Sequence, residues 1–159
     1  MSAELAPHEQ RVLDVIESVL GPLVADGRAK LHVAGGNKHI GAIFQVTPTR
    51  EDACPVKIRC EAAGDLDLFV GHYQLTTHMW NASEWKRGDY AALEDQLREW
   101  LTALISGRYR EEVRLIKDGR AGKGRGILEL PSGPWRFRYS KADSFWTRGP
   151  WERIIYAAY

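Results

Sequence analysis

The chain has 159 residues, of which 44% are hydrophobic and 27% are charged, and its formal net charge is +1 at pH 7. This length suits one domain with a sizeable core, and this composition excludes an intrinsically disordered chain. The sequence pI of about 7.8 is low for a protein that binds nucleic acid with its whole surface.

No apolar stretch approaches the roughly 20 residues that a membrane-spanning helix needs. The first ten residues, MSAELAPHEQ, lack the basic and apolar regions of a secretory signal. We therefore expect a cytoplasmic protein with no membrane partner.

Two segments have the periodicity of amphipathic helices. The first runs from Pro7 to about Ala25, and Gly21-Pro22 near its end predicts a kink or a restart. In the second, Asp89 is a suitable N-cap and Gly107 a suitable C′ residue. Its apolar stripe consists of Leu93, Leu97, Trp100, Leu101 and Leu104.

Alternation of apolar and polar residues predicts eight strands, four between the helices and four after the second helix. Gly71 is expected to form a bulge or bend in the longest of them. The connectors are too short for parallel crossovers, so the strands should pair antiparallel. We predict one α+β domain over residues 1–159, in the order α-β4-α-β4, with two amphipathic helices packed on a mostly antiparallel sheet of about six to eight strands. The expected strands cover residues 30–34, 41–46, 56–60, 65–79, 112–117, 126–130, 135–139 and 152–156.

Cys54 and Cys60 enclose an alternating stretch that reads as one extended strand. Six strand steps would separate them by roughly 20 Å, whereas a disulfide needs Cα atoms within about 7 Å. We expect two free, buried thiols, and their spacing does not match a zinc site.

The residues that most often carry catalysis form no recognisable motif. His72 and His78 share a strand face at a separation of roughly 20 Å, which is too far for a common metal ion. Asp65 and Asp67 share a face at about 6 to 7 Å, but no apolar pocket near them would separate an acid from a base. We expect no cofactor and no metal, and the sequence leans against an enzyme. An active site assembled from separate strands would nevertheless leave no linear motif.

The run GRAGKGRG at residues 119–126 invites comparison with a phosphate-binding loop. It lacks the G-x4-G-K-[ST] order, and it joins two predicted strands rather than a strand and a helix. We interpret it as a flexible basic hairpin loop.

Charge is distributed unevenly along the chain. Residues 1–106 contain 10 Lys+Arg and 15 Asp+Glu, whereas residues 107–159 contain 12 and 6. In this basic third, the rings at positions 135, 137 and 139 alternate with Arg136 and Arg138, so rings and arginines should occupy opposite faces of a strand. Either the rings lie in the core with the arginines merely solvated, or the arginines belong to a basic face that meets an acidic partner.

The second interpretation predicts a small non-catalytic module that binds an acidic protein partner, as an inhibitor or immunity-type protein would, through a basic and aromatic sheet face. Two alternatives stay open: an enzyme or small-ligand binder with a pocket between helices and sheet, and nucleic-acid binding through the basic third. The candidate binding residues are Arg114, Arg136, Arg138, Lys57, Arg59, Trp146 and Trp151.

Overall fold

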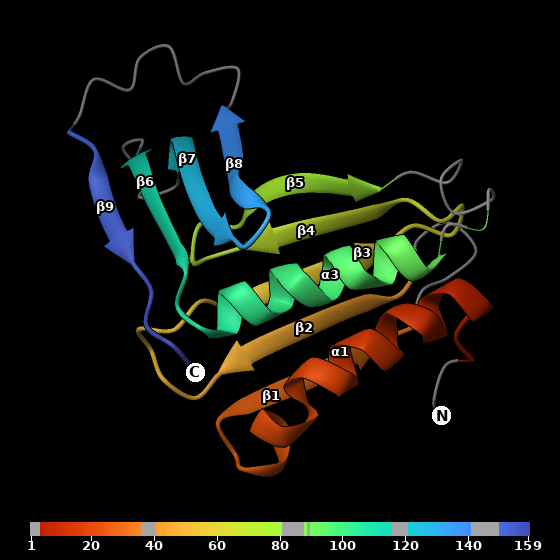
Figure 1. Cartoon of the computed structure of the whole chain (residues 1–159). Helices are drawn as coiled ribbons and strands as arrows, with labels where there is room; N and C mark the ends of the chain where they lie inside the picture. The colour runs from red at the N-terminus through yellow and green to blue at the C-terminus, as the bar shows by residue number, and fades with distance from the viewer. Residues whose placement is uncertain (1–3, 36–40, 81–87, 89, 116–120, 141–149) are drawn as a thin grey trace.

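The structure is a computed structural model that describes residues 4–35, 41–80, 88, 90–115, 121–140 and 150–159. Within these residues the chain forms two helices and nine strands, and the strands make two antiparallel sheets (Figure 1). This arrangement confirms the mixed α+β class, but the prediction of a single sheet with six to eight strands is wrong. Neither helix in the described ranges has the length and apolar composition needed to cross a membrane.

Helix α1 (Pro7–Ala25) begins at a proline, whose fixed φ suits a first helical turn. Glu9 in this turn is buried, and its carboxylate accepts hydrogen bonds from the backbone N–H groups of Ala6 and Ala42, both at 2.8 Å. One side chain thus caps the helix and ties it to the first sheet.

The predicted restart at Gly21-Pro22 is not found, because α1 continues through Pro22 in its last turn. The carbonyl of Pro22 accepts the N–H of Asp26 at 3.0 Å, so helical hydrogen bonding resumes directly after the proline. The buried stripe of the helix follows the predicted periodicity and consists of Val12, Val15, Ile16, Leu20 and Leu23.

Helix α3 (Tyr90–Ile105) buries all five residues of its predicted apolar stripe. It ends as expected at Gly107, which has a φ of +73° and whose N–H bonds to the carbonyl of Leu104 at 3.2 Å. A side chain at Gly107 would also overlap the backbone of residues 156–158. The predicted N-cap, Asp89, lies outside the described residues.

The first sheet contains five strands that neighbour one another in chain order, and both helices cover the same face of it (Figure 1). The predicted long strand at 65–79 is divided in two, because Gly71 adopts a φ of +77° and turns the chain. The strands are β1 (Ala29–Ala34), β2 (Ile43–Pro48), β3 (Val56–Cys60), β4 (Leu66–Val70) and β5 (Leu75–Trp80).

The second sheet contains four strands in the order β8-β7-β6-β9. It does not join the first because the adjacent edge strands, β5 and β8, meet through side chains. Trp135 Nε1 donates to Thr77 Oγ1 at 3.3 Å, and the Trp135 ring lies 5.0 Å from that of Trp100 on α3. The strands are β6 (Tyr109–Leu115), β7 (Ala121–Leu130), β8 (Gly133–Ser140) and β9 (Glu152–Ile155).

Strand β7 corrects the interpretation of residues 119–126 as a loop. Its glycines at 122, 124 and 126 alternate with Lys123 and Arg125, and the glycines are buried. A Cβ at Gly124 would collide with Leu75, and one at Gly126 would collide with the Tyr109 ring. The glycines are therefore the inner face of a strand that lies close against bulky core residues.

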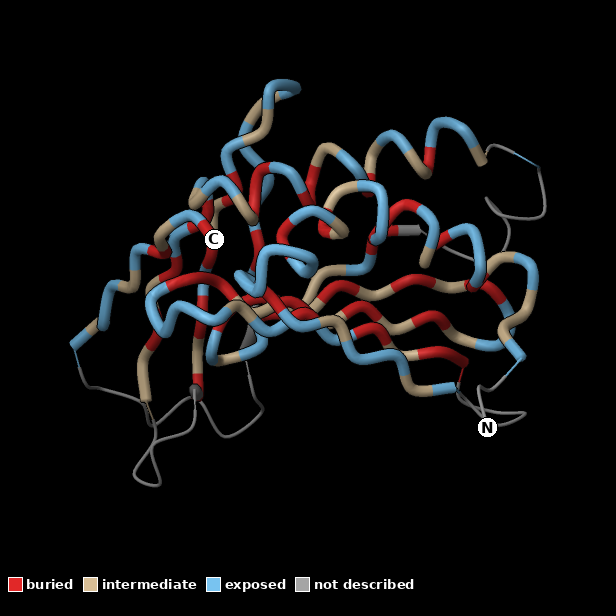
Figure 2. The backbone as a smooth tube through the Cα atoms, turned by 90° about the horizontal axis from the view of Figure 1, so that it is seen from below, coloured by how far each residue is buried: buried red, intermediate tan, exposed pale blue. Residues whose placement is uncertain are grey.

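The segment after β9 closes the core between the two sheets. The N–H of Tyr159 donates to the carbonyl of Ile105 at 3.0 Å, and the Tyr159 hydroxyl donates to the carbonyl of Cys54. The N–H of Ala157 donates to the carbonyl of Asp52 at 2.8 Å. Figure 2 shows the buried residues concentrated where helices and strands face each other, with exposed residues on the outer sides.

Candidate functional site

The outer face of the second sheet gathers most of its charge. Inward-facing residues of β6 and β8, such as Tyr109 and Phe137, are buried, so the residues between them point outward. The antiparallel register then aligns outward residues of four strands in rows, for example Arg153, Glu112, Arg125 and Arg138. We call this surface the basic face; it comprises Arg110, Glu112, Arg114, Lys123, Arg125, Ile127, Glu129, Arg136, Arg138, Arg153 and Ile155.

The basic face carries seven basic and two acidic side chains among the described residues, an excess of five positive charges. A cavity of about 630 Å³ lies over it, bordered by Arg110, Lys123, Arg138, Trp151 and Arg153. The cavity lies on the outside of the second sheet rather than between helices and sheet, where the small-ligand alternative expected a pocket.

Glu112 lies in the middle of the basic face and is held by two arginines. Its Oε2 accepts from Arg125 Nε at 2.6 Å and lies 2.5 Å from Arg125 Nη2. Its Oε1 accepts from Arg153 Nη2 at 2.9 Å and from Arg153 Nε at 3.2 Å. These bonds from Arg153 and Arg125 hold the pKa of Glu112 below its usual range, so the carboxylate is charged at neutral pH.

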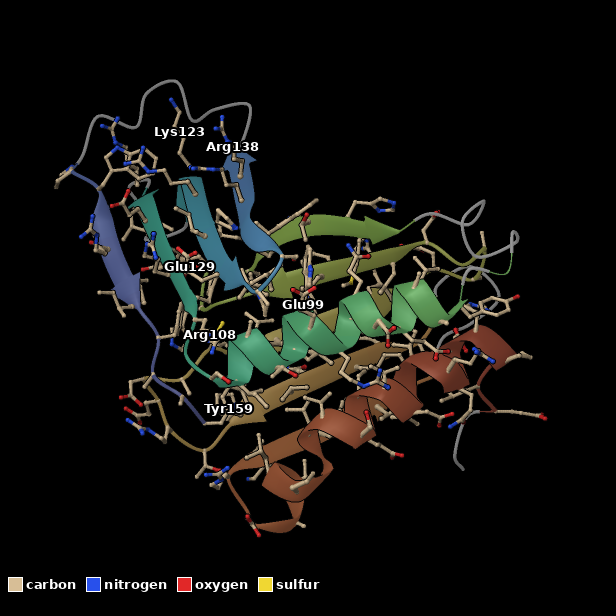
Figure 3. The ribbon with its side chains drawn as sticks, in the orientation of Figure 1. Glu99, Arg108, Lys123, Glu129, Arg138 and Tyr159 are labelled. Atoms are coloured by element: carbon tan, nitrogen blue, oxygen red, sulfur yellow. The ribbon has the colours of Figure 1, made fainter. Side chains whose placement is uncertain are left out.

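The remaining charges divide the face into a neutralised side and a cationic side. Glu129 pairs with Arg110 at 3.0 Å near the rim. Within the described part of the chain, no acidic side chain pairs with Lys123, Arg136 or Arg138. Figure 3 shows Lys123 and Arg138 at the end of the second sheet that is farthest from α3. Lys123 and Arg138 thus bring to this end of the cavity a positive charge that no acidic side chain among the described residues pairs with.

Trp151 adds an aromatic ring to the cavity wall. The guanidinium carbon of Arg114 lies 4.9 Å from the ring centroid, and that of Arg125 lies 4.3 Å from it. Two cation–π contacts of this kind fix the arginines and occupy the ring. The ring therefore positions charge and is not a free stacking platform.

Four of the seven predicted binding residues come together here: Arg114, Arg136, Arg138 and Trp151. Trp146 lies outside the described residues. The structure does not bring Lys57 and Arg59 to this face, because both lie on β3 in the first sheet. The sequence missed Lys123, Arg125 and Arg153, although the alternation of Gly122 to Gly126 with basic residues was a readable strand signal.

Lys57 and Arg59 also have local partners that use their charge. Lys57 Nζ donates to Gln74 Oε1 at 2.9 Å and lies 4.5 Å from the Phe69 ring centroid. Arg59 forms ion pairs with Glu61 at 2.9 Å and with Asp67 at 2.8 Å. We therefore do not include them in the candidate site.

Two aromatic residues of β8, Trp135 and Phe137, face inward, as the first of the two interpretations expected, and the side chain at position 139 lies outside the described part of the structure. Phe137 is 1% exposed, and its ring lies edge-on to that of Tyr109 at 5.5 Å. Trp135 is 40% exposed and packs on Trp100. The arginines of the strand line the charged cavity on the opposite face, and their contact with an acidic partner stays a prediction.

A second polar cluster lies beneath the sheet, around Glu111. This carboxyl is 1% exposed and accepts hydrogen bonds from the hydroxyls of Tyr109 (2.8 Å) and Tyr156 (2.5 Å). Burial raises the pKa of Glu111, and the two hydroxyl donors offset part of that rise. A Cβ at Gly71 would collide with Glu111 and Tyr156, so the cluster fills the contact between the two sheets.

The candidates for catalysis are not assembled into an active site. His78 Nδ1 lies 2.9 Å from Asp67 Oδ1 on the first sheet. Burial alone would raise the pKa of Asp67, but hydrogen bonds from His78 and Arg59 outweigh it and lower that pKa. His72 lies in the turn after β4 rather than on a shared strand face. In the described ranges, no three His, Cys, Asp or Glu side chains are placed to hold a metal ion.

Cys54 and Cys60 are free and buried, which confirms that prediction. Burial raises the pKa of both thiols well above its usual range, so neither forms a thiolate at neutral pH.

Comparison of the chain with family models, with curated proteins and with solved structures finds no match.

Proposed function

We propose that the protein binds an acidic segment of a partner protein on the basic face. The observation that carries this proposal is the cavity over that face, with Lys123, Arg136 and Arg138 on its β7–β8 side and no acidic partner for them among the described residues. A partner that places carboxylates there gains charge-assisted hydrogen bonds and faster association. Ile127 and Ile155, which share the face, offer apolar contacts between the charges.

Three features favour a protein over nucleic acid. A carboxylate, Glu112, stands in the middle of the face and repels phosphates. Trp151 already carries two guanidinium groups, and Phe137 is buried, so neither ring is free to stack on a base.

Catalysis has less support, because the two thiols are buried and protonated.

A second candidate function is the binding of a small polyanion in the same cavity. A volume of about 630 Å³ lies within the range of ligand pockets. Guanidinium groups are also the usual partners of carboxylate and phosphate groups in small ligands.

The test is a double charge reversal, Arg136→Glu with Arg138→Glu. The matched control, Arg28→Glu with Lys30→Glu, makes the same change of charge at exposed positions near the first sheet. The probes are a labelled peptide of alternating acidic and leucine residues, a single-stranded oligothymidylate, and pyrophosphate. Association rates are measured by stopped flow at several salt concentrations.

We expect the reversal to slow association of the acidic peptide by about ten- to a hundredfold at low salt, with a smaller effect at high salt. The control pair should change the rate much less. A folded reversal variant that binds the acidic peptide as fast as the wild type would refute the proposal. Loss of pyrophosphate binding alone would favour the small-polyanion function instead.

A further inference from the structure

The position of Glu112 distinguishes it from the other acid on the basic face. In the register, Glu112 lies between Arg153 on β9 and Arg125 on β7, so it occupies the middle of a row that crosses all four strands. Its side chain is only 23% exposed. Glu129, in contrast, is 47% exposed and pairs with Arg110 as its one cation among the described residues.

Glu112 engages both arginines through their forked ends. Each guanidinium directs Nε and one Nη toward the carboxylate, at distances from 2.5 to 3.2 Å. Arg125 is fixed further by its contact with the Trp151 ring at 4.3 Å. One fork of each guanidinium, its Nε and one Nη, is therefore already used inside the protein.

A continuous polyanion and a protein partner meet this arrangement differently. A nucleic-acid strand carries closely spaced phosphates, so a strand that crosses the face must place charge beside Glu112. A protein segment has separate carboxylates, which can reach Lys123 and Arg138 on one side of Glu112. The middle of the segment then places a neutral group beside Glu112. Arg138 lies in the same row as Glu112 but two strands away, about 9.6 Å at the usual strand spacing, so a carboxylate can reach Arg138 without lying beside Glu112.

We infer that Glu112 is a specificity-determining residue that admits partners with separate acidic groups and rejects continuous polyanions. The inference rests on the proposed function, because it concerns which anions the same face accepts.

The experiment compares Glu112→Gln with Glu129→Gln. Both variants remove one negative charge from the same face, but only the first releases two arginines from the centre. Glu112→Asp is the conservative variant that keeps the negative charge. Glu112→Ala removes the charge, as Glu112→Gln does, but introduces no amide group. All four substitutions lie on the outer face, and circular dichroism and urea unfolding check that each variant is folded.

Equilibrium affinity is measured for an oligothymidylate and for the acidic peptide, across a range of salt concentrations. We expect Glu112→Gln to bind oligothymidylate about tenfold more tightly than Glu129→Gln does, with a salt dependence steeper by about one to two phosphate contacts. Glu112→Ala should behave like Glu112→Gln, and Glu112→Asp like the wild type. The gain in affinity for the acidic peptide should be clearly smaller than the gain for oligothymidylate.

Equal gains for Glu112→Gln and Glu129→Gln would show a simple effect of net charge and overturn the inference. If Glu112→Gln gained affinity equally for oligothymidylate and for the acidic peptide, Glu112 would weaken binding of all anions without discriminating between them. This result would also overturn the inference. Neither result bears on the proposed function, which fails only if the reversal at Arg136 and Arg138 leaves binding of the acidic peptide unchanged.

Discussion

Replacing Tyr156 with phenylalanine removes a hydroxyl group that makes two hydrogen bonds at the contact between the sheets. The hydroxyl donates to Glu111 Oε1 at 2.5 Å and accepts the backbone N–H of His72 at 2.9 Å. The ring itself stays, so its stacking on Tyr109 at 5.6 Å is retained. The substitution therefore isolates the two hydrogen bonds from the packing.

The expected loss follows from the partners of these bonds. A hydrogen bond to a charged group contributes about 1.5 to 3 kcal/mol, and one between neutral groups about 0.5 to 1.5 kcal/mol. We therefore expect Tyr156→Phe to lower the free energy of unfolding by about 2 to 4 kcal/mol near neutral pH. This is a large fraction of the stability of a typical domain.

The loss should also depend on pH. Burial raises the pKa of Glu111 in the folded state above its unfolded value, so the folded protein loses stability as pH rises through that interval. Removal of the Tyr156 hydroxyl takes away a bond that favours the charged form, and the folded-state pKa rises further. The difference between variant and wild type should thus be smallest below the unfolded pKa of about 4.3, where only neutral hydrogen bonds are lost, grow with pH, and level off above the raised value.

Urea unfolding from about pH 4 to about pH 8 measures both effects. Tyr159→Phe is the control, because its hydroxyl donates to the Cys54 carbonyl, which does not titrate. The loss of unfolding free energy in Tyr159→Phe should show little dependence on pH. A loss below about 0.5 kcal/mol for Tyr156→Phe, or one that is constant over this pH range, would refute the reasoning.

Two further predictions concern packing. Leu101 is fully buried in α3, so Leu101→Ala should cost about 2 to 5 kcal/mol in urea unfolding, and a cost below about 0.5 kcal/mol would show that the helix face is wrongly assigned. Gly126→Ala places a methyl group against the Tyr109 ring, whose hydroxyl is held by Glu111, so it should cost about 1 to 3 kcal/mol by overpacking. Gly21→Ala, at a site with no positive φ and no atom close to the new Cβ, is the control without the collision, and an equal loss there would argue against overpacking at Gly126.

Local patterns in the sequence were sufficient for the helices and for most strands. The stripe from Leu93 to Leu104 and the stop at Gly107 depend on neighbours a few residues away. The division into two sheets was not predictable in this way, because it depends on Trp135 meeting Thr77 and Trp100 across long separations in the chain. The second half of the strand at 121–130 was predicted, but its first half was read as a loop because glycine usually signals one, whereas here Leu75 and Tyr109 require it.

The candidate site was predictable only where it depends on a local pattern in the sequence. Alternation along β8 was enough to place Arg136 and Arg138 on one face. The role of Glu112 depends on its register with Arg125 and Arg153, which a single sequence does not contain. Lys57 and Arg59 were included on the assumption that their strand, β3, lies beside the strands of the basic third. These strands belong to different sheets.

The contacts of the segment after β9 bear on how the protein acquires its structure. Residues 156–159 follow every other element along the chain, yet Tyr159 donates to Cys54, 105 positions earlier, and Ala157 donates to Asp52. Contacts between such distant positions slow folding, since a long loop must close before they form. The core that the first sheet shares with α3 is therefore complete only once residues 156–159 have packed against it.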